Sequence, residues 1–269
     1  MVRILVTGFE PFGGHSENIS GQIVNALPSQ LLLDDPWSSL REYAKESLEV
    51  TLETRVLPVD EAGSLEIANA VQEGENWDAI LHLGLCESCE KPRIETRAQD
   101  LLQMRIPDNS GRQITQQSIT GLGNLPVTVL ADAWMSMPWS VECELSQDAG
   151  TYLCNETLYR TLHALKVISS DDKTIPPCLF VHLPLVEKCS FPNALSFVQE
   201  VLQRMMFRPV LSVVGALITR DEHYLVAQRS SSESHAGKWE FPGGKVEANE
   251  TQSSALEREM HEEFGWSVT

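Results

Sequence analysis

The sequence is poor in basic residues and has no long apolar run. Lysine and arginine together number 20, against 38 aspartates and glutamates, which gives a formal charge of −18 over 269 residues. Such a surface repels nucleic-acid backbones and anionic membranes, so we expect neither as a partner. No stretch approaches the roughly 20 apolar residues of a membrane span, and the short apolar start lacks a signal peptide's features. The expected location is the cytoplasm.

Cysteine is also sparse. Six cysteines spread through a chain of this length do not resemble a disulfide framework, which is consistent with a reducing compartment. Cys86 and Cys89 form a CxxC motif, but no second CxxC or histidine pair stands at the spacing of a zinc site. We therefore expect two free thiols in a loop there, and no metal.

Apolar runs alternate with helical stretches through the first three quarters of the chain. With 42% hydrophobic residues, the chain can bury a sizeable core. The alternation predicts an α/β fold, with a mostly parallel sheet flanked by helices and ligands bound at the carboxyl ends of the strands. The expected strands are 2–7, 50–57, 78–83, 141–145 and 178–184; the expected helices are 20–27, 62–72, 155–165 and 194–206, with 131–137 weakly helical and 29–50 a surface connection with part of a helix.

The first loop, GFEPFGG at 8–14, follows the first expected strand. A strand, a glycine-rich loop and a helix are typical of phosphate sites, but there is no GxGxxG, and His15 follows Gly14 where a P-loop has lysine. Phe9 and Phe12 could instead form an apolar wall for a small ligand. The alternative is that both are core phenylalanines, and the sequence favours neither.

Cys154 lies close to the expected start of the helix 155–165. The unpaired N–H groups and the positive end of a helix stabilise thiolate over thiol, and only thiolate is a strong nucleophile. By position alone, a buried structural thiol is the more common interpretation. The same holds for Glu95, which alone suggests a surface carboxylate, and for His182, which alone suggests a structural histidine at a strand end.

Short motifs along the chain favour a catalytic interpretation of these three residues over a structural one. Each is weak alone, but their order along the chain is specific. They are GFEPFGG at 8–14, Glu95 with Ala98, RIPDN at 105–109, DAGTYLCN at 148–155 and FVHLP at 180–184. In this order they resemble pyroglutamyl peptidase I, a family of cysteine peptidases, over about residues 1–207.

The resemblance implies an active site of three residues. Cys154 would be the nucleophile, His182 the general base and acid, and Glu95 the residue that orients the imidazole. These residue types suit the chemistry, which needs a weakly acidic sulfur, a group that titrates near neutrality and an anion that stabilises imidazolium. The implied peptidase needs no cofactor, and the family tends towards homotetramers.

The resemblance also implies a pocket for small peptides that begin with pyroglutamate. This residue carries no ammonium group, so an apolar pocket suits its lactam ring. Phe9, Phe12 and Ile106 match pocket positions of the family, and Asn18 belongs to the same substrate-binding set. Arg105 and the backbone N–H of Cys154 would hold the tetrahedral oxyanion.

Three positions depart from the family pattern. Ile19 stands between Asn18 and Ser20 where the family has proline, Leu85 replaces a glutamine, and Asp100 replaces an asparagine. Leu85 bears on hydrogen bonding to the lactam. A binding protein whose Cys154 site has lost turnover is therefore the alternative to an enzyme.

The composition changes at Pro209. An apolar strand is expected at 210–218 and a second at 224–228, and residues 244–266 then match every fixed position of the Nudix box. The segment therefore resembles the nucleotide-cleaving Nudix enzymes. A helix is expected from Thr251 to Phe264, ended by Gly265. Its carboxylates at i, i+3 and i+4 could hold Mg²⁺ against a diphosphate. The implied metal-site residues are Gly244, Glu259, Glu262 and Glu263.

The two resemblances predict two domains. Residues 1–207 would be peptidase-like, and residues 208–269 would be a partial α+β Nudix segment of roughly half the family's length. The residues that grip a nucleoside lie outside this segment, so we expect it to be loosely ordered and catalytically silent, with Mg²⁺ bound only if it is functional. The alternative is a Mg²⁺-dependent nucleoside triphosphate pyrophosphohydrolase of the oxidised-dGTP type, with the front domain as passenger.

Overall fold

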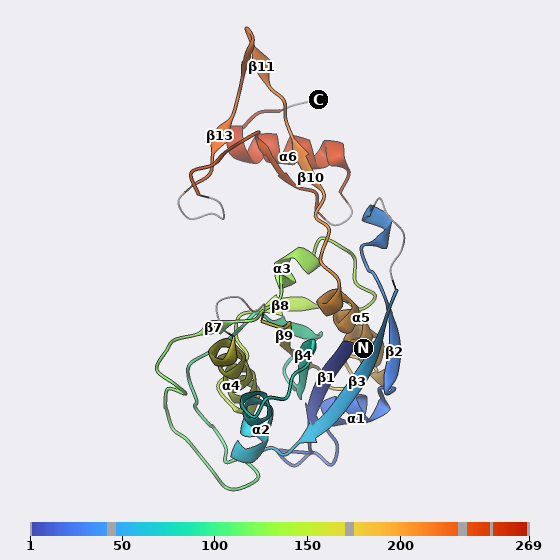
Figure 1. Cartoon of the computed structure of the whole chain (residues 1–269), viewed down its shortest axis with the longest axis vertical. Helices are drawn as coiled ribbons and strands as arrows, with labels where there is room; N and C mark the ends of the chain where they lie inside the picture. The colour runs from blue at the N-terminus through green and yellow to red at the C-terminus, as the bar shows by residue number, and fades with distance from the viewer. Residues whose placement is uncertain (1, 42–46, 170–174, 231–235, 248–249, 268–269) are drawn as a thin grey trace. The chain divides into compact units, whose positions relative to one another are not determined.

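The computed structural model describes residues 2–41, 47–169, 175–230, 236–247 and 250–267. It divides into two compact units. The first comprises residues 1–132 and 139–208, and the second comprises residues 133–138 and 209–269. Figure 1 shows the course of the chain through both units.

The first unit is built on a mixed sheet whose described strands follow the order β2-β3-β1-β4-β9-β5-β8. The central strands are parallel: β1 pairs with β3 and β4, and β4 pairs with β9. The β5–β8 pair is also parallel, whereas β2 runs antiparallel to β3 and β5 runs antiparallel to β9. The bounds are β1 Val2–Phe9, β2 Gln30–Asp34, β3 Ser47–Leu57, β4 Ala79–Leu85, β5 Arg93–Glu95, β8 Glu144–Ser146 and β9 Cys178–Leu183. The predicted α/β fold with a mostly parallel sheet is confirmed.

Helices cover both faces of this sheet (Figure 1). Helices α2 (Glu61–Gln72) and α4 (Leu153–Ile168) pack against each other, and α1 (Ile19–Ala26) packs against α5 (Phe191–Met206). The core beneath α2 and α4 is apolar because strands buried on both faces carry continuous hydrophobic runs. Its fully buried members include Leu5, Ile67, Ile80, Leu158 and Phe180. The short elements are η1 Ser38–Leu40, β6 Arg97–Ala98, β7 Leu125–Pro126 and α3 Ala131–Trp134.

Residues 29–50 differ from the prediction of a surface connection with part of a helix. They contain the edge strand β2, which pairs antiparallel with β3, and the 3-10 turn η1. Burial alternates along β2, with Leu31 half-buried and Leu33 buried, but Leu32 is apolar and 61% exposed, so the sequence lacks the alternation of apolar and polar residues that marks a half-buried strand. Residues 42–46 lie outside the described part of the chain.

The described part of the second unit after Pro209 contains short antiparallel strand pairs and a C-terminal helix. Strand β10 (Val213–Gly215) pairs with β15 (Gly243–Lys245), β11 (Thr219–Arg220) with β12 (His223–Tyr224), and β13 (Ala227–Gln228) with β14 (Trp239–Glu240). The expected long strands 210–218 and 224–228 are therefore wrong: the first is shortened to β10, and the second is divided between β12 and β13. Helix α6 (Gln252–Phe264) is capped by the Thr251 side chain and ends at left-handed Gly265, as predicted.

None of the described helices is both long and apolar enough to cross a membrane.

Candidate active site

Two neighbouring strands bring His182 and Glu95 together. Glu95 is the last residue of β5, and His182 lies near the end of β9, which pairs antiparallel with it. Because side chains two residues apart share one face of a strand, both residues project from the same side of the sheet. Nδ1 of His182 lies 2.7 Å from Oε1 of Glu95. The Glu95 side chain is fully buried, and 12% of the His182 side chain is exposed.

The carboxylate fixes how His182 is protonated. An ionised carboxylate only accepts hydrogen bonds, so Nδ1–H donates to Glu95 and Nε2 is left for the Cys154 thiol, with which the imidazole also interacts. Burial lowers the pKa of His182, but its hydrogen bonds with Cys154 and Glu95 raise it, and the net result is about 9. The imidazolium form is therefore stabilised at neutral pH.

The start of helix α4 carries Cys154. The helix begins at Leu153, and the N-cap residue Tyr152 makes no side-chain capping bond. The N–H groups of the first turn, including that of Cys154, have no partner within the helix, so they and the helix dipole favour a negative charge there. The thiol is only partly buried, unlike the other free cysteines. This environment is suited to a reactive thiolate.

Gly84 provides the space that the Cys154 sulfur occupies. It lies on β4, directly opposite His182 on β9. A Cβ atom at this position would lie 3.0 Å from Sγ of Cys154 and 2.7 Å from the ring of Phe180. Any larger residue would therefore displace the thiol or the ring.

A pocket of about 830 Å³ contains these residues. It lies at the carboxyl ends of the strands, as predicted for this type of sheet. Phe12 and Tyr152 form one apolar wall, with ring centroids 5.3 Å apart. The sequence-predicted residues that line it are Cys154, His182, Glu95, Phe12, Arg105 and Ile106, together with Leu85.

Two of the residues expected to bind substrate lie outside this lining. Phe9 is 4% exposed, and its ring packs 6.4 Å from that of Phe180, which makes it a core residue. The side chain of Asn18 caps helix α1 by accepting from Ser20 N–H, and it donates to the carbonyl of Glu10 at 3.0 Å. Asn18 therefore holds the loop that carries Phe12 and does not itself face the pocket.

Asp100, the departure from the family's asparagine, also lies outside the pocket lining. Its carboxylate accepts from the backbone N–H groups of Ile119 and Thr120, both at 2.8 Å, and of Gly123 at 3.0 Å. Burial raises its pKa, but these bonds outweigh burial and lower it. Asp100 thus organises the neighbouring loop 118–123.

The segment 99–112 carries the pocket residues Arg105 and Ile106, and residues beside Cys154 hold it in place. The Asn155 side chain donates to the carbonyls of Gln99 and Leu101 at 2.9 and 3.0 Å. The Tyr152 hydroxyl donates to the carbonyl of Pro107 at 3.2 Å. Hydrogen bonds therefore link the start of α4 to the segment that forms this wall of the pocket.

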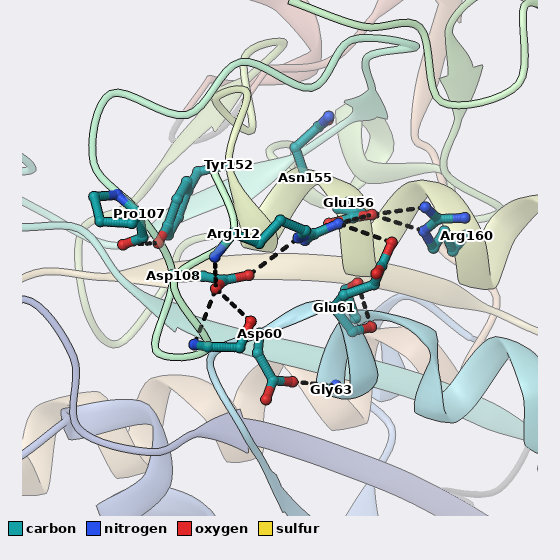
Figure 2. Close-up of polar contacts among 12 residues, drawn as sticks. Asp60, Glu61, Gly63, Pro107, Asp108, Arg112, Tyr152, Asn155, Glu156 and Arg160 are labelled. Carbon is teal, nitrogen blue, oxygen red and sulfur yellow. Dashed lines mark hydrogen bonds and ion pairs between the residues drawn. The ribbon is translucent and has the colours of Figure 1, made fainter. Parts of the chain in front are cut away.

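Sequence reasoning missed the strongest of these connections, which is made by Arg112. Figure 2 shows Arg112 lying between Asp108 of this segment and Glu156 of α4. The guanidinium contacts Asp108 at 3.1 Å, Glu156 at 2.6 Å and Glu61 of α2 at 3.1 Å. Arg160 completes the cluster from the other side of Glu156, at 2.7 Å. The side chains of Asp108 and Glu156 are fully buried.

The CxxC motif forms a disulfide between Cys86 and Cys89, so the expectation of two free thiols is wrong. The two residues lie in a tight turn after β4, with the N–H of Cys89 donating to the carbonyl of Cys86. This turn brings the residues within disulfide reach, a geometry that the spacing alone does not fix. Cys86, with Glu87 and Ser88, lines the pocket.

Thiol labelling should distinguish Cys154 from the other cysteines. We expect iodoacetamide without reductant to modify Cys154 first, because Cys86 and Cys89 are paired and the remaining thiols are buried. Burial raises the pKa of Cys143 to about 12 and also raises the pKa values of Cys178 and Cys189. Peptide mapping by mass spectrometry checks this. A pyroglutamyl aldehyde should protect the site, and equal labelling of Cys86 before reduction would contradict the assignment.

The Nudix-like segment brings together some of its predicted metal-site residues. A Cβ on Gly244 would overlap the Glu259 carboxylate, so the two are in close contact. However, Arg258 already pairs with Glu259 at 2.8 Å, with Glu262 at 3.4 Å and with Glu250 at 3.0 Å. Within the described residues, no three His, Cys, Asp or Glu side chains gather closely enough to hold a metal ion. These residues, as they stand, do not fit a bound Mg²⁺.

The first unit has the fold and the site of a cysteine hydrolase of the α/β class: a thiol, an imidazole and a buried carboxylate meet in one pocket at the strand ends. The model of the pyroglutamyl peptidase family matches residues 2–195, and the chain belongs to this family. The NUDIX domain model matches residues 209–269.

Individual relatives agree with the family assignment. The chain is 28% identical to a pyrrolidone-carboxylate peptidase of Thermococcus litoralis over 68% of this chain and 77% of that protein. It is 31% identical to one of Coprothermobacter proteolyticus over 69% of this chain and 83% of that protein. The solved pyrrolidone carboxyl peptidase of Fervidobacterium islandicum, 28% identical, superposes with a TM-score of 0.62 over 77% of this chain and 99% of that one.

Proposed function

We propose that this protein is a cysteine peptidase that hydrolyses the amide bond after an N-terminal pyroglutamyl residue of a peptide. The observation that carries the proposal is the 2.7 Å contact of His182 with Glu95 in the pocket that also contains Cys154. The similarity to pyrrolidone-carboxylate peptidases supports the substrate class.

The reaction divides the work among three residues. The Cys154 thiolate attacks the pyroglutamyl carbonyl carbon, and the tetrahedral intermediate collapses as the His182 imidazolium gives its proton to the leaving amine. The C–N bond breaks, and the pyroglutamyl group remains as a thioester on the sulfur. Neutral His182 then takes a proton from water, whose oxygen displaces the sulfur and releases pyroglutamate. Glu95 holds the imidazole in one tautomer throughout and stabilises its charged form.

We assign stabilisation of the oxyanion to two groups. The Cys154 N–H belongs to the first turn of α4 and has no acceptor within the helix. The Arg105 side chain lines the same pocket. The Cys154 N–H is fixed by the helix before the charge develops, so it needs little reorganisation, which makes such a donor effective.

The apolar lining suits the uncharged lactam ring. Phe12, Tyr152 and Ile106 supply this lining, and 49% of Ile106 is exposed before substrate covers it. Covering such surface contributes to binding through the hydrophobic effect. A free N-terminal ammonium packed against these three side chains would lose hydration without gaining a charged partner from them. The proposed peptidase reaction needs no cofactor. We also predict a homotetramer and a cytoplasmic location.

Two assays test the proposed function against its alternatives. A pyroglutamyl-arylamide reporter and an oxidised nucleoside triphosphate are each incubated with the full chain, with and without EDTA. We expect turnover of the reporter alone, unaffected by EDTA. Binding of a pyroglutamyl peptide without turnover would instead identify a binding protein, and metal-dependent release of pyrophosphate would identify a Nudix enzyme.

We predict that residues 208–269 are catalytically silent. Arg258 neutralises Glu259 and Glu262, so these carboxylates are not available as they stand to hold Mg²⁺ against a diphosphate. Pyrophosphate release from nucleoside triphosphates should therefore stay at background with Mg²⁺ present, while the same preparation cleaves the reporter. Metal-dependent release that disappears in Glu262→Gln would contradict this prediction.

A further inference from the structure

Most polar side chains that line the pocket already have partners. Arg93 contacts Glu144 at 2.5 Å, and Glu87 contacts His15 at 2.8 Å. The remaining pairings are Asp148 with Gln99, the Tyr152 hydroxyl with the Pro107 carbonyl, the Thr151 hydroxyl with the Gln103 carbonyl, Ser88 with Cys86, and His182 with both Glu95 and Cys154. Within the described part of the chain, the side chains of Gln103 and Arg105 are the lining groups left without a hydrogen bond.

The backbone of Gln103 is fixed beside the catalytic helix. Its N–H donates to the Thr151 carbonyl at 2.8 Å, and its carbonyl accepts from the Thr151 hydroxyl at 2.9 Å. Both main-chain polar groups are therefore occupied. What Gln103 can offer to a ligand is its side-chain carboxamide.

The neighbours of Gln103 determine which way that side chain lies. Leu102 and Met104 are 4% and 3% exposed, whereas Gln103 is exposed. The segment is extended here, since Leu102 pairs with Gln117 and the N–H of Met104 donates to the carbonyl of Ile114. Successive side chains of an extended segment lie on opposite faces, so two buried neighbours direct Gln103 to the open pocket side.

The chemistry of the two unpaired groups separates their roles. Arg105 has five N–H donors and no acceptor, so it suits a developing oxyanion. A lactam has one N–H and one C=O, and its ring holds them in the cis arrangement on one edge. A carboxamide carries both a donor and an acceptor, so it can pair with both groups at once. Leu85, on the adjacent strand end, offers neither.

We propose that Gln103 is a specificity-determining residue that recognises the N–H and C=O edge of the substrate's lactam ring, an assignment that rests on the proposed peptidase function. The ring lies between the apolar wall of Phe12 and Ile106 and the Gln103 carboxamide. The scissile carbonyl then faces Cys154 and Arg105. Because the Gln103 backbone is already held by Thr151, little backbone ordering is needed on binding.

The test compares Gln103→Met, which keeps size and removes both hydrogen-bonding groups, with Gln116→Ala as the control. Gln116 is an exposed glutamine in the same region that does not line the pocket. With the pyroglutamyl-arylamide reporter, Gln103→Met should raise KM about 10-fold, as expected for one or two lost hydrogen bonds, and change kcat less. Gln116→Ala should match the wild type.

Competitive inhibitors identify the edge that is recognised. The wild type should bind 2-pyrrolidone more tightly than N-methyl-2-pyrrolidone, which lacks the N–H, and than cyclopentanone, which lacks the amide. Gln103→Met should lose this discrimination and bind 2-pyrrolidone no more tightly than the other two. An unchanged ranking of the three inhibitors in Gln103→Met would overturn the proposal.

The same ligands separate this inference from the proposed function. Should the wild type fail to cleave the reporter, the peptidase function is wrong, and stabilisation by 2-pyrrolidone in thermal unfolding still tests the lactam contact. That stabilisation should be present in the wild type and in Gln116→Ala and absent in Gln103→Met. Equal stabilisation of all three would leave Gln103 without the proposed role.

Discussion

Replacing Cys154 by alanine should lower kcat/KM for a pyroglutamyl-arylamide by at least about 10⁴-fold, and His182→Ala should do nearly the same. The two side chains act as one unit, because the imidazole both maintains the thiolate and supplies the proton for the leaving amine. The double variant should therefore be little worse than either single one. Thermal unfolding of each variant checks that the fold is kept. Wild-type turnover by Cys154→Ala would refute the mechanism.

Glu95→Gln provides the contrast within the same series. Glutamine preserves the size of the side chain but removes its charge, so a measurable residual rate should remain. The wild-type rate should fall as pH rises through about 9, since the raised pKa of His182 marks the loss of its proton. Without the carboxylate that pKa falls, and the alkaline limb of the pH profile moves to lower pH. An unmoved limb would show that Glu95 does not tune the imidazole.

The parts of the fold that local sequence encodes were predictable. Strands such as Val2–Phe9 and Cys178–Leu183 are buried on both sides and appear as continuous apolar runs. Helix α4 is amphipathic, with residues such as Leu158 and Leu162 facing the core. The strand Gln30–Asp34 lies at the edge of the described sheet and pairs with β3 alone. Its sequence therefore lacks the long apolar run of a central strand.

The site residues were found through ordered motifs and could not have been found one by one. Glu95 suggested a surface carboxylate, and it is fully buried only because β5 pairs with β9, 87 residues away. The role of Arg112 depends on Glu156, which lies 44 residues further along the chain, and no nearby residue indicates that contact. The only local hint was Asp108, four residues before Arg112, at a spacing that allows an ion pair. Phe9 and Phe12 were indistinguishable by sequence, yet only Phe12 lines the pocket.

The Arg112 cluster should contribute to both stability and substrate binding. Burial alone would lower the pKa of the guanidinium, but Glu156 and Asp108 raise it, so the arginine stays charged. Removing one partner of a buried ion pair leaves the other charge uncompensated. Here the uncompensated groups would be the buried carboxylates of Asp108 and Glu156 (Figure 2).

We expect Arg112→Ala to lower the free energy of unfolding by about 3 kcal/mol. It should also reduce kcat/KM by about 100-fold, because the segment that carries Arg105 and Ile106 loses its link to the helix of Cys154. Chemical denaturation and reporter kinetics measure the two effects. Arg112→Lys should recover part of the stability but less of the activity, since lysine cannot reproduce the forked contacts with Asp108 and Glu156.

Arg160→Ala is the matched control for this prediction. Arg160 also pairs with the buried Glu156, but it lies on the same helix, and among the described residues it makes no ion pair with Asp108 of the segment 99–112. Its loss should therefore reduce stability while leaving KM close to the wild-type value. If both alanine variants lose kcat/KM equally, the cluster acts only through the stability of α4. If only Arg112→Ala does, Arg112 positions the pocket wall against the catalytic thiol.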